Sequence, residues 1–458
     1  MQETKENKMG VMPVKKLIIT MSLPMMISML VQALYNVVDS MFVARLSEDA
    51  LTAVTLAFPM QNTLIAFAAG TGVGINALLS KSLGEKRFDR ADEAANNGLF
   101  LAFLTYILFL LVGLFGAGPF IGTQINDAVV QEYGTIYLRI CLCASFGAIF
   151  QVTFERLLQS TGRTIYSMVS QATGAIINII FDPIMIFGLF GFPKMGVAGA
   201  AAATVLGQVV AACIACFLNL KKNDDIHISI RQILRPSGEV IRRIYFVAVP
   251  SILMMSIGSV MTYAMNQILG AFSKTATAVF GVYFKLQSFF FMPVFGLNNG
   301  LIPVLAYNYG ARRKERIDEA LKFSVALAVG IMLCGTLIFH LFPGALLGMF
   351  NASEEMLRIG VPALRIISLS FGLAGACIAM GSIFQAFSYS YYSLMVSVGR
   401  QIVVLIPVAR FLASFGEVTR IWWAFPIAEL VSTFLSVIFF LRLYNRVVKP
   451  LQGSPARE

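Results

Sequence analysis

Four carboxylic acids lie inside long apolar stretches of the sequence: Asp39, Glu155, Asp182 and Glu429. The other twenty of the 24 Asp and Glu residues lie outside these stretches or at their ends. A charged side chain at the centre of a bilayer costs about 2.5 kcal/mol or more, so each of the four needs a partner or a use. Their positions mark them as candidates for chemistry.

Asp39 and Asp182 each belong to a polar stripe. Tyr35 and Asn36 precede Asp39 by four and three residues, and Asn178 precedes Asp182 by four, so each group shares one face of a helix. Desolvation favours a neutral carboxyl and a nearby cation favours a carboxylate, so such a group can exchange a proton for a metal ion or a cationic substrate. The oxygens suit a hard cation such as Na⁺. Alternatively, both acids only form interhelical hydrogen bonds.

The second half of the chain has its own charges within apolar stretches: Lys285, Arg400 and Glu429. Pairing of Glu429 with either cation would hold this half together, and a gating or substrate role is the alternative. Glu155 is followed directly by Arg156 near the end of a stretch, which favours a structural role.

The composition excludes a soluble enzyme. Hydrophobic residues make up 57% of the 458 residues and charged residues 13%, against about 25% charged in soluble domains. The mean hydropathy is +0.77. We expect no cofactor, since neither an HExxH motif nor another nucleophile or metal constellation is present.

Twelve apolar stretches are each long enough to cross a bilayer as a helix. They lie near residues 15–44, 50–80, 93–117, 129–157, 164–190, 196–219, 243–270, 275–307, 317–343, 356–386, 391–414 and 420–446. Of the 35 Lys and Arg residues, 25 fall on one predicted side. The positive-inside rule places both termini in the cytoplasm. The net charge of +11 therefore reports topology rather than a nucleic-acid partner.

The two halves of the chain align at an offset of 226 residues. Pro24 matches Pro250, and the segment from Arg87 to Ala94 matches that from Arg313 to Ala320. Each half holds six stretches, so we expect an all-α membrane protein of two parallel six-helix lobes around a central cavity. The expected lobes are residues 1–220 and 243–458, joined by a cytoplasmic linker at 221–242.

The polar stripes are not repeated. The counterparts of Asp39, Asn178 and Asp182 are apolar: Met265, Val404 and Val408. We therefore expect the coupling chemistry in the first lobe. Two lobes around a midplane site favour alternating access, with a channel or a membrane enzyme as minor alternatives.

Several segments resemble the multidrug and toxic compound extrusion family over essentially the whole chain. They are the segment from Leu34 to Arg45, the turn from Leu158 to Gly162, NIIFDPIMIF from Asn178 to Phe187, and GVAGAAAATVLGQ from Gly196 to Gln208. Three further motifs look most like its MepA-type branch of bacterial drug exporters: FERL at 154–157, YFKLQ at 283–287 and AFPIAE at 424–429.

The resemblance implies secondary active efflux of varied, often cationic compounds, driven by H⁺ or Na⁺. Asp39, Asn178, Asp182 and Thr204 match the cation or proton site of relatives, which makes them the candidate Na⁺ ligands. Tyr35 matches a tyrosine one turn before that aspartate, and we expect Tyr35 and Asn36 to line the substrate cavity. Other relatives use acids in the seventh and tenth spans for coupling. The corresponding stretches of this sequence, 243–270 and 356–386, contain no Asp or Glu.

The resemblance also implies a bacterial plasma-membrane location, and we expect a monomer whose partners are small molecules and the bilayer. The alternative function is export or flipping of a lipid-linked or metabolite substrate on the same scaffold. A cavity lined by basic residues would favour that alternative, because lipid-linked pyrophosphates are anionic.

Overall fold

The computed structural model describes residues 6–350 and 352–451, and within them all regular structure is helical. Within this described part of the chain, ten helices are each long and apolar enough to cross a bilayer. Two further pairs of described helices are long and apolar enough only when each pair is taken together. Each pair is bent at a short break, by 44° in one and 46° in the other. Counting each pair as one span gives the expected twelve. Each break falls inside an expected single span, 129–157 or 356–386.

The chain divides into two compact units, and each unit contains residues from both halves of the sequence. One unit contains residues 1–26 and 253–458, and the other residues 27–252. Two long helices therefore contribute to both units: α2 (Val14–Leu46) and α11 (Gly238–Gly270). The two boundaries are related by the 226-residue offset and follow Pro24 and Pro250 by two residues. By contacts, residues 1–26 group with most of the second expected lobe, and the expected linker 221–242 and residues 243–252 group with the first.

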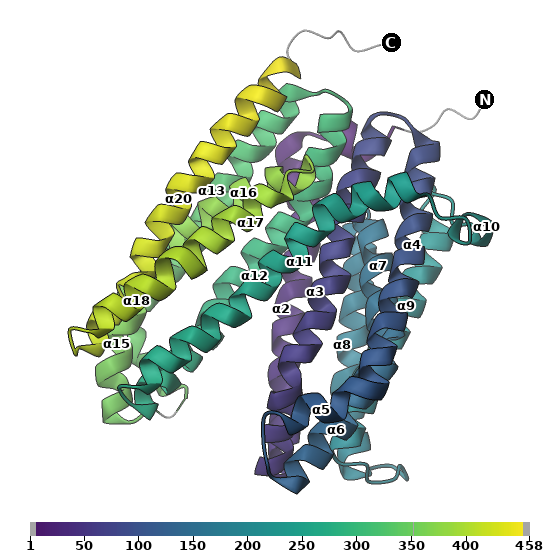
Figure 1. Cartoon of the computed structure of the whole chain (residues 1–458). Helices are drawn as coiled ribbons and strands as arrows, with labels where there is room; N and C mark the ends of the chain where they lie inside the picture. The colour runs from purple at the N-terminus through teal and green to yellow at the C-terminus, as the bar shows by residue number, and fades with distance from the viewer. Residues whose placement is uncertain (1–5, 351, 452–458) are drawn as a thin grey trace. The chain divides into compact units, whose positions relative to one another are not determined.

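The unit formed by residues 27–252 is built around α3, which packs against α4, α6 and α7, while α9 packs against α6, α7 and α8 (Figure 1). Besides parts of α2 and α11, the helices of this unit are α3 (Glu48–Gly84), α4 (Phe88–Leu111), α5 (Ala117–Gly122), α6 (Ala128–Cys143), α7 (Phe146–Ser160), α8 (Thr164–Phe187), α9 (Val197–Lys222) and α10 (Ile230–Ile233). The start of α11 packs in this unit because glycines of α3 leave room for the α11 backbone to approach closely. A Cβ on Gly70 would lie 2.5 Å from Ile252 Cγ1 and 2.9 Å from Ile252 N.

In the other unit, the equivalent glycine of α12 allows a similarly close approach of a helix backbone. A Cβ on Gly296 would lie 2.6 Å from the backbone N of Met26 in α2. Small residues let helix backbones approach this closely in membranes. The helices of this unit are α1 (Lys8–Val11), α12 (Lys274–Gly310), α13 (Lys314–Leu341), α14 (Pro343–Gly348), α15 (Glu354–Ser368), α16 (Phe371–Ala386), α17 (Ser390–Val398), α18 (Ile406–Ala413), α19 (Val418–Ile421) and α20 (Ala424–Leu443).

Candidate ion-coupling site

The residues predicted for the first lobe lie on three helices of the unit 27–252: Asp39 on α2, Asn178 and Asp182 on α8, and Thr204 on α9. A tight loop fixes the register of α8 against α9. Gly188 ends α8 in the left-handed conformation with φ of 74°, which glycine adopts without strain. Across the loop, the N–H of Gly196 donates to Ile186 O at 3.1 Å. This register places Thr204 beside Asn178.

Two glycines bring α8 and α9 into backbone contact next to the site. A Cβ on Gly207 would lie 2.6 Å from the carbonyl oxygen of Gly174, and 3.3 Å from Asn178 Cβ. A side chain on either glycine would therefore push the helices apart at the level of Asn178.

We expect Gly207→Ala to destabilise the protein by about 1–3 kcal/mol, because overpacking must be relieved by helix displacement. The same displacement separates Thr204 from Asn178, so transport should fall as well. Thermal unfolding in detergent measures the first effect. Gly330→Ala in α13 is the control, since a Cβ there meets nothing within 4 Å. Equal melting temperatures for the two variants would contradict the close-packing role of Gly207.

The carboxyl groups of Asp39 and Asp182 lie within hydrogen-bonding reach of each other. Asp182 is fully buried, and Asp39 Oδ1 is buried without a hydrogen-bond partner among the described residues. Two adjacent carboxylates repel each other unless a proton or a cation lies between them. The pair is therefore a place where one positive charge can be held.

Asn178 connects the acids to α9. Its Nδ2 donates to Thr204 Oγ1 at 3.2 Å and to Asp182 Oδ1 at 3.4 Å. With the amide rotated, its nitrogen donates to Asp182 Oδ2 at 3.2 Å, and its oxygen accepts from the N–H and the hydroxyl of Thr204, both at 3.2 Å. In both orientations the predicted residues of α8 and α9 form one hydrogen-bonded group.

Three polar residues that the sequence did not indicate lie beside this group. Gln61 on α3 donates from Nε2 to Tyr137 Oη at 3.4 Å and to Cys141 Sγ at 3.3 Å, both on α6. Tyr137 and Cys141 are close enough to Asp39 to interact with it electrostatically. The only hint in the sequence is that Gln61 matches Gln287 in the repeat.

The two residues expected to line a substrate cavity are placed differently. Tyr35 lies near Asp39 and Asp182, with which its hydroxyl interacts electrostatically. Asn36 is exposed, and its carbonyl accepts from Ser40 Oγ at 2.9 Å. Among the described residues, no hydrogen bond joins the Asn36 side chain to the acids.

The other buried acids have separate surroundings. Glu155 accepts from Gln151 Nε2 and from Ser170 Oγ, both at 3.1 Å. In the second half, Arg400 Nη1 and Glu429 Oε2 form an ion pair at 3.3 Å. Lys285 is exposed, and no ion pair joins it to Glu429 among the described residues.

Comparison with known proteins gives a family match in both halves of the chain. The MatE family model matches residues 24–184 and 250–411. These segments correspond to the two copies of the internal repeat.

Curated relatives and solved structures agree with this match. The chain is 25% identical to the multidrug export protein MepA of Staphylococcus haemolyticus, covering 93% of each chain. It is also 25% identical to an FAD transporter of Shewanella oneidensis, covering 97% of each. An outward-facing structure of a multidrug resistance MATE family transporter superposes with a TM-score of 0.91 at 25% identity, covering 99% of this chain and 100% of that one.

Proposed function

The chain belongs to the MatE family of multi-pass membrane transporters, which are not enzymes, and we propose that it exports structurally varied, often cationic compounds in exchange for H⁺ or Na⁺. The observation that carries the exchange is the pair of adjacent carboxyl groups, Asp39 and Asp182, with an unpartnered oxygen on Asp39. The name of the S. haemolyticus relative supports varied drugs as substrates.

The acid pair holds one positive charge at a time. When a proton or Na⁺ occupies it, the negative charge of the pair is reduced by one unit, so the pair attracts a cationic drug less strongly. When the ion leaves, the negative charge returns and favours binding of a cation. Because the two states of the pair differ in affinity for the same drug, ion entry drives drug release, which makes export an exchange.

The residues present also fit Na⁺ as the exchanged ion. Asp39 and Asp182 supply carboxylate oxygens, Asn178 an amide oxygen and Thr204 a hydroxyl, all of which are hard ligands. A proton needs only the two carboxyl groups. Asn178 then serves to orient Asp182, to which it is hydrogen-bonded.

A bend of α2 would link the pair to conformational change. Pro24 lies within α2, and the boundary between the units follows it by two residues. A proline inside a helix removes a backbone hydrogen bond and allows a kink. A static kink is the alternative, because Pro250 occupies the same position in α11, which lacks the acid.

The location follows from the same family. We propose the bacterial plasma membrane, both termini in the cytoplasm, and a monomer that carries small molecules. The excess of Lys and Arg on one predicted side supports this orientation.

The test is ethidium transport in proteoliposomes, with a pH gradient and a Na⁺ gradient imposed separately. We expect transport against the ethidium gradient under at least one of them, and the effective gradient identifies the coupling ion. Proteoliposomes that equilibrate ethidium at the same rate under both gradients and without any gradient would contradict exchange.

A second candidate is export of an anionic metabolite or a lipid-linked substrate. The FAD transporter of S. oneidensis, which is as similar to this chain as the drug exporter, supports it. The same vesicles loaded with FAD distinguish the two. Gradient-driven FAD transport without ethidium transport would favour the second candidate.

A further inference from the structure

The segment that joins the two sequence halves, residues 221–242, is hydrogen-bonded along the side of α4. Three side chains near the start of α4 accept hydrogen bonds from its backbone N–H groups. The bonds run from His227 N to Asp92 Oδ1 at 2.7 Å, from Ser229 N to Asn96 Oδ1 at 2.9 Å and from Ser237 N to Asn97 Oδ1 at 2.8 Å. Asn96 also donates from Nδ2 to Gln232 Oε1 at 2.7 Å. These bonds set the position of α10 at the edge of its unit (Figure 1).

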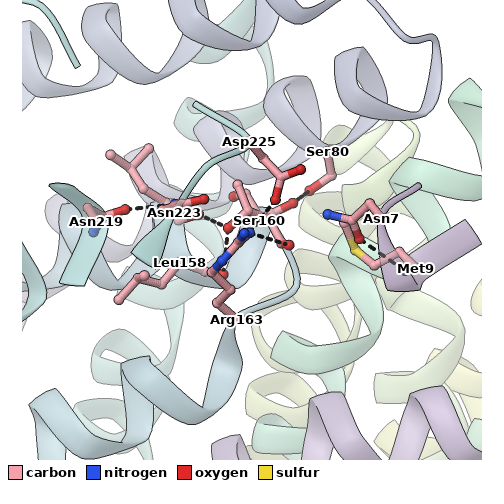
Figure 2. Close-up of polar contacts among 11 residues, drawn as sticks. Asn7, Met9, Ser80, Leu158, Ser160, Arg163, Asn219, Asn223 and Asp225 are labelled. Carbon is pink, nitrogen blue, oxygen red and sulfur yellow. Dashed lines mark hydrogen bonds and ion pairs between the residues drawn. The ribbon is translucent and has the colours of Figure 1, made fainter. Parts of the chain in front are cut away.

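The beginning of the segment is held independently. Arg163, after the end of α7, forms an ion pair with Asp225. Asn223 donates from Nδ2 to Asn219 Oδ1 at 2.9 Å, at the end of α9. Figure 2 shows both contacts beside Ser160, the last residue of α7. The segment is thus fixed on both sides of α10.

We infer that these contacts place α10 near a membrane interface, because the predicted span that contains most of α4 begins near residue 93. Asp92 and Asn97 lie four and nine residues inside α4 from its first residue, Phe88. At a rise of about 1.5 Å per residue, this is about 6–14 Å from the helix end. A segment bound beside that stretch therefore lies beside the start of the predicted span, where we expect the boundary between headgroups and acyl chains.

The outer face of α10 carries two large apolar side chains. Ile230 is 76% exposed and Leu234, at the end of the helix, is 73% exposed. Four residues apart, they share one face of the turn. The hydrogen bonds to α4 prevent this face from turning inward. A short amphipathic element of this kind, fixed at an interface, favours insertion into lipid.

A cavity of about 400 Å³ lies between this segment and α4. Its lining includes Arg231 and Arg235, together with Ser229 and Ser237. One acidic residue of α4, Glu93, also lines it.

The two arginines carry the charge of this cavity. Of the nearby acids outside the lining, Asp225 and Glu239 are paired with Arg163 and Arg243, and Asp92 contacts His227. Among the described residues, no ion pair engages Arg231 or Arg235. Two arginines against one carboxylate leave the cavity net positive.

We propose that α10 and this cavity form a binding site for an anionic phospholipid. Ile230 and Leu234 enter the acyl region, while Arg231 and Arg235 bind the headgroup phosphate. Anionic lipids attract basic segments of this kind at the cytoplasmic surface of membranes. The site rests on the proposed cytoplasmic position of the segment, but not on the transported substrate or the coupling ion.

The test measures lipid binding to the full-length protein in neutral detergent by native mass spectrometry and thermal unfolding. The probes are phosphatidylglycerol, phosphatidylcholine and inorganic phosphate. We expect phosphatidylglycerol to bind and raise the melting temperature, and phosphatidylcholine to bind at least about tenfold more weakly. Phosphate alone should produce no shift.

Variants locate the binding. Arg231→Gln with Arg235→Gln should weaken phosphatidylglycerol binding about tenfold or more, and Ile230→Ser with Leu234→Ser should weaken it as well. Replacing both arginines by lysine should retain most binding. Lys221→Gln with Arg242→Gln removes the same charge outside the cavity and should bind as the wild type does.

Three results would overturn the proposal. The first is unchanged binding in the Arg231 and Arg235 glutamine variant. The second is an equal loss in the Lys221 and Arg242 control, which would indicate attraction by net charge alone. The third is stabilisation by inorganic phosphate that is insensitive to Ile230 and Leu234, which would indicate a soluble anion instead of a lipid.

Discussion

Asp39→Asn and Asp182→Asn should each reduce gradient-driven ethidium export about 5- to 150-fold, the range of coupling free energies between 1 and 3 kcal/mol. Asparagine keeps the size of the side chain but cannot exchange a proton and carries no charge to hold Na⁺. The remaining carboxyl group then has no acidic neighbour, so the pair no longer changes charge in the way that exchange requires.

The measurement is ethidium efflux from proteoliposomes with equal amounts of folded protein. Asp127→Asn is the matched control. Asp127 caps α6 by accepting from Val129 N at 2.9 Å and Val130 N at 3.1 Å, and asparagine is as good a helix cap as aspartate. Export at the wild-type rate by Asp39→Asn would refute a role of the pair in coupling.

The second large effect concerns the stability of the unit that contains α20. Glu429→Leu should lower the free energy of unfolding by about 3 kcal/mol, because it leaves Arg400 without its partner. We take the lower end of the range for broken buried pairs because the Arg400 side chain is 30% exposed. Arg400 lies in a π-helical segment, Gly399–Leu405, so its position depends on an irregular turn.

A double-mutant cycle separates a structural pair from a gating role. Arg400→Met combined with Glu429→Leu should recover most of the lost melting temperature, because no unpaired charge remains. Export per folded molecule should stay near the wild-type level in the double variant. A stable double variant that no longer exports would instead assign the pair to gating or to substrate binding.

The acids of the proposed coupling site could be found from the sequence because a charge in an apolar helix is costly. Asp39 and Asp182 stand out for that reason, and the structure places them together. Gln61, Tyr137 and Cys141 carry no such signal, because neutral side chains are tolerated in an apolar helix. Their contacts join residues 76 and 80 positions apart, which helical spacing does not reveal.

The spans were predictable but their breaks and partners were not. The α6/α7 break falls at Ala144 and Ser145, and the α15/α16 break at Leu369 and Ser370. Neither contains Pro or Gly, the usual sequence signals of an interruption. Hydropathy also does not indicate which helices pack against one another, so the packing of residues 1–26 with 253–458 could not be deduced.

The unit boundaries at two equivalent positions have a consequence for a chain that contains only one repeat. In each unit, the opening 26 residues of one repeat complete the bundle formed by the remainder of the other. One repeat alone could therefore complete its bundle only by exchanging its opening helical segment with a second copy. In this chain the exchange is intramolecular, so we expect co-expressed fragments 1–226 and 227–458 to reassemble.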